Sequence, residues 1–325
     1  MSPLFGKKKD DGRTILILDV ESGSIGGALV RFSPGQQPKV FGETRHPLPL
    51  RATYEPQILA DLALREVEQV LRRVAEVAAR VRGHQTLSLV GEVGRVVVFL
   101  SPPWGALSIT NRILDPHPFI ARLRQSLEAF FGPVLLTFQP FGLAAAHTTP
   151  TIFPSDGHYL LSAISGEVTE LILLENEKTN LKIVAHATIP FGHHYPLRTL
   201  LSHGNISLAE AHSALRLGTL NTPSHALEAL HAAGKEVAGE FASVAGELLL
   251  HTPARKVIVV AQEPMGEWFA RTLAGAGELT KLFPDTGEVR AMRAGNVTPF
   301  MAVHTRRPDL PLLLEALFLD SEVRE

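Results

Sequence analysis

The feature that most constrains the fold of this chain is the segment from Ile15 to Phe32. An apolar stretch ends at Asp19 and Glu21, a Ser/Gly turn follows at residues 22–24, and a second apolar stretch leaves the turn. This pattern predicts a β-hairpin. A turn of this kind can direct backbone N–H groups at a phosphate, and an aspartate at the end of a strand can hold a hydrated Mg²⁺. The hairpin is therefore a candidate phosphate-binding loop.

Composition limits the classes of protein to consider. The chain has 325 residues, 45% of them hydrophobic, which is enough for two domains or lobes with buried cores. The formal net charge is −2, so no global attraction for nucleic acid exists. The chain contains no cysteine, which excludes disulfides and thiolate metal sites. Its fourteen histidines form no metal-binding motif, and we expect them to be ordinary surface or cleft histidines.

No segment has the pattern of a targeting or membrane-spanning sequence. Residues 1–13 are polar and rich in lysine, unlike a signal peptide, and the longest apolar runs, such as 96–100 and 257–261, have only strand length. Lys7, Lys8 and Lys9 would give only weak contact with an anionic membrane. We expect a cytoplasmic protein that does not insert directly into a membrane.

The first half of the chain predicts a sheet and an attached unit of helices and strands. A third strand is expected at 39–43, a long amphipathic helix at 55–82 and a buried strand at 96–100. Residues 107–114 alternate like a hairpin partner of that strand, residues 119–131 have helical periodicity, and residues 134–138 suggest another strand. The segment 50–132 is interpreted as a small inserted α+β domain.

The second half repeats the opening pattern. Strand, Ser/Gly turn and strand recur over residues 159–174, and a third strand follows at 181–189. Helices are expected at 207–217, 225–250 and 266–273, with a strand at 256–260. Residues 312–319 form an apolar helix or strand that we expect to dock on one lobe.

The order of these parts resembles the actin-like ATPase superfamily, and within it the branch that contains FtsA and PilM. The residues that carry the resemblance are 4–9 with 18–25, 138–144, 189–192, and 207–217, which reads as the S-x-x-E-A helix of the family. The resemblance implies an α/β, ribonuclease H-like fold of two lobes with a small inserted domain. Its expected divisions are a first lobe at 1–49 and 133–150 with part of 300–325, the insertion at 50–132, and a second lobe at 151–299 with a helical subdomain near 193–253.

The resemblance also implies a nucleotide cleft between the lobes. The candidate nucleotide-binding residues are Asp19, Ser22, Gly23, Ser24, Ser165, Gly166 and Thr169. Asp19 is also the candidate ligand of Mg²⁺, which it would hold through a water molecule. No catalytic residue is assigned.

Each element of that cleft departs from the family pattern. Glu21 stands where glycine is usual, and its carboxylate would repel phosphate. Ala163 replaces the aspartate of the second hairpin, and Gln262 and Glu263 replace glycines that make room for the nucleotide. Because metal placement and charge stabilisation supply most of the acceleration of phosphoryl transfer, these changes predict poor hydrolysis. ATP and Mg²⁺ are therefore not expected to be required.

The resemblance implies a binding role in place of catalysis. One expected partner is the N-terminal peptide of a PilN-like membrane protein, bound near residues 95–115. Other proteins of a type IV pilus assembly platform are also expected partners. The chain would then be held at the inner membrane through a protein partner. Trp104 is either part of that peptide groove or partly buried. Homo-oligomerisation is left open, as are two alternative functions: a working Mg-ATP-dependent ATPase and an FtsA-like cell-division filament.

Overall fold

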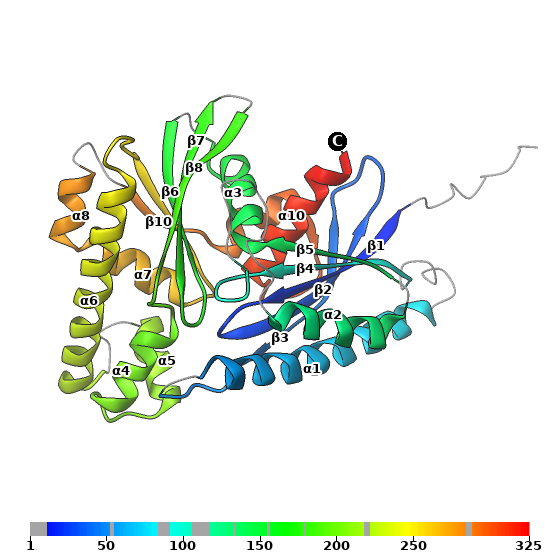
Figure 1. Ribbon diagram of the computed structural model, residues 1–325, viewed down its shortest axis with the longest axis horizontal. Helices are drawn as coiled ribbons and strands as arrows, with labels where there is room; N and C mark the ends of the chain where they lie inside the picture. Colours follow the sequence, from blue (N-terminus) through cyan, green and yellow to red (C-terminus); the bar gives the residue numbers. More distant parts are fainter. Residues whose placement is uncertain are drawn as a thin grey trace, which may run out of the picture.

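The computed structural model describes residues 12–52, 55–83, 92–105, 118–132, 134–154, 157–177, 180–217, 222–283 and 288–324. These residues form two β-sheets, each with helices on its outer face, and two further helices lie between the sheets (Figure 1). This is the expected two-lobed α/β architecture. The predicted partner strand at 107–114 lies outside the described residues.

The sheet of the first lobe contains six strands in the order β11-β3-β2-β1-β4-β5. The predicted hairpin forms its centre, with β1 and β2 antiparallel and Asp19 paired with Gly26. The other side of β1 pairs with β4 in parallel, and β4 pairs in parallel with β5. The strands are β1 (Arg13–Val20), β2 (Ser24–Phe32), β3 (Lys39–Pro47), β4 (Val93–Leu100), β5 (Leu135–Pro140) and β11 (Ala302–Val303).

Two helices cover the outer face of this sheet: α1 (Pro56–Arg82) and α2 (Pro118–Phe131). Helix α1 begins with proline at its first turn and ends with Arg80 and Arg82 beside the negative end of the helix dipole. Its buried residues recur every three or four positions, from Leu59 to Ala78, and pack on the face of β1 that carries Leu16 and Leu18.

The expectation of a separate inserted domain at 50–132 is wrong for the described residues. Strand β4 lies inside the six-stranded sheet, between β1 and β5, and α1 packs on β2 and β3. Apolar residues of β4 are buried against both layers of helices, as Val96 and Val97 show. Its near-continuous apolar run is therefore that of a parallel strand covered on both faces. Helices α1 and α2 and strand β4 are thus parts of the first lobe.

The sheet of the second lobe contains five strands in the order β10-β9-β6-β7-β8. Strands β6, β7 and β8 form an antiparallel meander like that of β1 to β3, and β9 adds to β6 in parallel. The strands are β6 (Gly157–Ile164), β7 (Thr169–Glu177), β8 (Asn180–Ile189), β9 (Lys256–Val260) and β10 (Glu288–Ala291).

A group of helices covers the outer face of the second sheet (Figure 1). The three predicted helices of this region are present, and two shorter ones accompany them. They are α4 (His194–Ser202), α5 (Leu208–Leu217), α6 (Ser224–Leu248), α7 (Met265–Ala274) and α8 (Gly277–Leu282).

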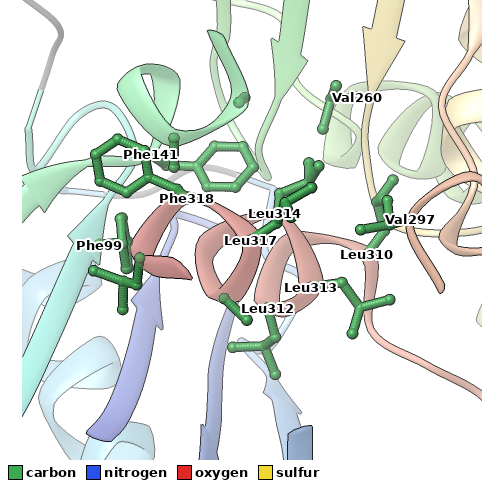
Figure 2. Close-up of a cluster of buried hydrophobic side chains, with 14 of the residues drawn as sticks. Phe99, Phe141, Val260, Val297, Leu310, Leu312, Leu313, Leu314, Leu317 and Phe318 are labelled. Atoms are coloured by element: carbon green, nitrogen blue, oxygen red, sulfur yellow. The ribbon is translucent and has the colours of Figure 1, made fainter. Parts of the chain in front are cut away.

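The layer between the sheets contains α3 (Phe141–Ile152) and α10 (Leu310–Arg324), with the short α9 (Ala294–Val297) and the 3₁₀ turn η2 (Thr298–Phe300) at one side. The apolar run near the C-terminus is thus a helix. Figure 2 shows Phe318 of this helix near Phe99 and Phe141 and Leu314 on the side of Val260, whereas Leu312 points to the opposite side of the helix. Because this core includes residues of both sheets, α10 connects the lobes mechanically.

Trp104 is 2% exposed and stacks on Phe119 with ring centroids 4.2 Å apart, so it is a core residue and does not present its ring to a peptide. No described helix combines the length and the apolar character that crossing a bilayer requires.

Candidate functional site

The turns of the two hairpins meet where the lobes face each other. The turn between β1 and β2 contributes Ser22, and the turn between β6 and β7 contributes Ser165 and Glu167. The hydroxyls of Ser22 and Ser165 are 3.1 Å apart, and the backbone N–H of Glu167 donates to Ser22 Oγ at 2.8 Å. A donor that could bind a phosphate oxygen is therefore used in a contact between the lobes.

Glycines allow the two turns to approach this closely. A Cβ atom on Gly23 would lie 2.7 Å from Gly166 Cα and 2.7 Å from Nε2 of His193, and a Cβ on Gly166 would clash with the backbone of Gly23. Gly192 packs against Gly166 in the same way. Burial lowers the pKa of His193 well below its ordinary value, so this ring is neutral beside the turns. The glycines serve direct backbone contact between the lobes.

The second turn is held on its own lobe by side-chain contacts. Thr169 Oγ1 donates to the carbonyl of Phe191 at 2.5 Å, and Ser165 Oγ donates to the carbonyl of Val168 at 2.8 Å. The carboxylate of Glu167 receives two bonds from Arg198, at 2.8 and 2.7 Å, and lies 2.8 Å from Nδ1 of His194. Partial burial opposes ionisation of Glu167, but the bonds from His194 and Arg198 hold its pKa at about 2.

Asp19, the predicted metal ligand, is paired with an arginine. Arg45, near the end of β3, places Nη2 2.6 Å from Asp19 Oδ2 and binds Asp309 through Nε at 2.5 Å and Nη2 at 2.9 Å. Burial opposes the charge of Arg45, but Asp309 and Asp19 raise its pKa well above the ordinary value. Burial raises the pKa of Asp19, against the effect of Arg45. A fixed guanidinium therefore occupies the position beside Asp19 where a hydrated cation was expected.

Glu21 and Gln262 form a contact between the lobes beside this ion pair. The amide Nε2 of Gln262 donates to Glu21 Oε1 and lies 2.5 Å from Ser24 Oγ, which also bonds to Glu21 Oε1 at 2.5 Å. Arg45 Nη1 donates to Ser24 Oγ at 2.8 Å. Burial raises the pKa of Glu21 to about 8, with Arg45 opposing the shift and Asp19 adding to it. Glu21 is therefore mostly protonated at neutral pH and acts as a hydrogen-bonding group.

The floor of the site is formed by α10 and the second sheet. Glu315 of α10 is fully buried, and burial together with the charge of Asp19 raises its pKa well above the ordinary value. Ala163 and Glu170 line the other side, at the facing ends of β6 and β7. The site thus contains an ion-pair network around Arg45, and beside it the carboxyl groups of Glu21 and Glu315, whose pKa values burial raises.

The space that remains between these groups is small. The cavity lined by Asp19, Glu21, Ala163, Ser165 and Gln262 measures about 10 Å³, which is room for about one water molecule. Ligand pockets are typically about 300–1,000 Å³. In this arrangement of the lobes, the residues do not fit a magnesium nucleotide, because Arg45, Gln262 and the opposing turn fill the space that its phosphates and metal would need.

All seven residues predicted for the cleft lie at this junction of the lobes, at the ends of β1, β2, β6 and β7. Sequence reasoning missed Arg45, Asp309 and Glu315. Glu315 could have been found, because it is a glutamate within the apolar stretch 310–319. Arg45 has no such local signal, and its partner Asp309 is 264 positions away in the sequence. Among the described residues, no three His, Asp or Glu side chains are arranged to hold a metal ion.

Comparison with known proteins identifies the fold. No protein-family model matches the sequence, and no curated protein matches it. The structure is similar to a "PilM-PilN type IV pilus biogenesis complex", with a TM-score of 0.58 and 13% identity over 95% of this chain and 98% of that chain. A ROK family glucokinase from Streptomyces griseus, with glucose and AMPPNP, gives a TM-score of 0.49 and 13% identity over 95% of this chain and 99% of that chain. The chain has the actin-like fold.

Proposed function

We propose that this chain is a cytoplasmic adaptor resembling PilM, with a nucleotide cleft that has become a fixed contact between two lobes. The observation that carries the proposal is the ion pair of Asp19 with Arg45 at 2.6 Å. Beside it, the backbone N–H of Glu167 in the second turn donates to Ser22 Oγ in the first turn. These groups satisfy one another without a ligand. The closed arrangement then needs no ATP to form.

Loss of hydrolysis follows from the same groups. Phosphoryl transfer depends on a metal that bridges phosphates and on positioned donors that stabilise the developing charge. Here the carboxylate that would orient the metal is held by Arg45, Ala163 offers no carboxylate in the second turn, and Gln262 crosses the cleft to Glu21. With these parts absent or engaged, binding is the function that the remaining surface supports.

The partner class is supported by the likeness to the complex named above. That structure contains PilM with PilN, and its similarity spans nearly the whole of this chain. We infer that this chain binds the N-terminal peptide of a PilN-like membrane protein, stands at the inner membrane through that partner, and contacts other proteins of a type IV pilus or related platform.

We assign the partner peptide to the groove between α1 and α2, in place of the region near residues 95–115 that the sequence suggested, of which residues 106–115 lie outside the described part of the chain. The groove has a volume of about 350 Å³ and is lined by Leu71, Ala129 and Phe130, with Glu68, Arg72, Gln125 and Ser126 around them. Phe130 is 40% exposed, whereas Leu123 and Leu127 of the same helix are buried in the core. An exposed aromatic over an apolar floor with a polar rim is typical of a peptide groove.

The test is binding to a PilN-like protein from the same genome. Vesicles that display its N-terminal peptide should retain the wild-type chain, and Phe130→Ser should weaken retention about tenfold or more, as expected for loss of an aromatic anchor. Leu250→Ser, at a 72% exposed leucine of the second lobe, is the matched control and should bind normally. Equal retention by vesicles without the peptide, or filament formation on lipid, would contradict the adaptor role.

A further inference from the structure

Beside the filled cleft lies a second, larger groove that the adaptor role does not use. Its volume is about 740 Å³, which is within the range of ligand pockets. One wall comes from the second lobe, through Arg216 of α5 and through Gln262 and Glu263 after β9. The opposite wall is the segment 306–311, which leads into α10, and α9 closes one end. The groove therefore spans both lobes.

Three arginines give this groove its chemical character. Arg216, Arg306 and Arg307 are exposed, and within the described parts of the chain none of them forms an ion pair. Other surface arginines of the chain do have such partners, for example Arg293 with Glu267 and Arg198 with Glu167. The carboxylate of Asp309 in the same lining is already bound by Arg45. The groove consequently presents guanidinium groups with donors available for an anion.

We propose that this groove binds an acidic segment of a partner protein, whose carboxylates pair with Arg216 on one lobe and with Arg306 and Arg307 on the other. Guanidinium groups bind carboxylates through two parallel N–H···O bonds, which favours this pairing over single-point contacts. Glu263 adds an acceptor for the N–H groups of a bound peptide. A polyphosphate offers only acceptors, so this mixed lining suits a peptide better.

The closed cleft also favours a peptide over a nucleotide. A nucleotide with its base in this groove would have to extend its phosphates into a space of about 10 Å³ that Gln262 and the two turns close. None of the described residues that line the groove is aromatic, so none of them offers a ring on which a base could stack. A peptide that lies along the groove needs neither feature.

Binding across both walls has a mechanical consequence. Gln262 and Asp309 each line the groove and also take part in the contacts that hold the lobes, through Glu21 and Arg45. A ligand that pairs with arginines of both lobes therefore stabilises the arrangement in which those contacts form. This surface is separate from the groove between α1 and α2, so its occupancy does not depend on the partner assigned above.

The experiment uses the full chain, immobilised, and a library of random eight-residue peptides whose retained members are identified by mass spectrometry. The wild type should retain peptides enriched in Asp and Glu. Arg216→Gln, Arg306→Gln and Arg307→Gln should each weaken the best peptide about two- to fivefold, the range for exposed ion pairs, and the triple variant should lose the enrichment. Arg255→Gln, at an exposed arginine immediately before β9, is the matched control.

Each outcome of the experiment decides a specific point. Phe130→Ser should retain the acidic peptides, which separates this groove from the proposed adaptor surface. Absence of enrichment, or equal enrichment by a triple variant that circular dichroism shows to be folded, would overturn the proposal. Displacement of the best peptide by Mg-ATP at similar concentration would instead assign the groove to a small anionic ligand.

Discussion

Arg45 Nη2 lies 2.6 Å from Asp19 Oδ2, so the aspartate near the end of the first strand is paired with a cation of the protein itself. The same guanidinium binds Asp309, which immediately precedes α10. One side chain thus joins β1, β3 and the C-terminal helix at the junction of the lobes. This relationship supports our proposal that the cleft closes without a bound cation.

Replacing Arg45 with methionine should destabilise the protein by about 3–5 kcal/mol, the cost of leaving buried carboxylates without their partner. The side chain of Arg45 is 13% exposed, so solvent cannot replace it fully. Urea denaturation measures the change. The control Arg73→Met breaks an ion pair whose side chains are 60% exposed and should cost less than about 1 kcal/mol. Equal effects of the two substitutions would contradict the structural role of Arg45.

The protonation of Glu21 should make stability depend on pH. Its pKa is about 8 in the folded protein and about 4.5 when unfolded, so the folded state binds more protons between these values. The stability that protonated Glu21 provides is complete below pH 4.5 and is lost as the pH rises toward 8, by at most about 1.4 kcal/mol per pH unit. Glu21→Gln should therefore match the wild type near pH 5 and be more stable at pH 8. A stability difference that stays constant with pH would disagree with a buried neutral Glu21.

The sequence predicted the elements more completely than their connections. Alternation and helical periodicity located β1, β2, α1 and α6, because burial on one face or both leaves a local pattern. The strand that became β4 was assigned to an inserted domain, since an apolar run does not show which sheet it joins. In the site, Glu21 and Gln262 were singled out separately as obstacles to a nucleotide, but the hydrogen bond between them depends on a closure that no local pattern encodes.

The close approach of the two turns should tolerate no side chain at Gly23. Gly23→Ala places Cβ 2.7 Å from Gly166 Cα, a backbone atom that cannot move aside cheaply, and should cost about 1–3 kcal/mol. Hydrogen exchange of the Glu167 amide should become faster because its bond to Ser22 is disturbed. In the control Gly94→Ala, no atom of the described residues lies within 4 Å of the new Cβ, and both properties should stay unchanged. Normal amide protection in Gly23→Ala would show that the turns are not in contact in solution.

The ion pair of Glu167 should stabilise the second turn above acidic pH. Its pKa is about 2 when folded and 4.5 when unfolded, so its contribution is present above pH 4.5 and is lost as the pH falls toward 2. Glu167→Gln should cost about 1–3 kcal/mol at pH 7, and the cost should shrink in acid. A double-mutant cycle with Arg198→Met measures the coupling. An additive double variant would argue against the bidentate pair between these side chains.

Titration of the purified chain with Mg-ATP, followed by calorimetry and by thermal unfolding, tests the central claim most directly. Because Arg45 holds Asp19 and the turns bind each other, we predict no binding heat and no change in melting temperature at millimolar nucleotide. A dissociation constant in the micromolar range, with a stabilisation of several degrees that disappears in Asp19→Ala, would contradict the account and establish a working nucleotide site.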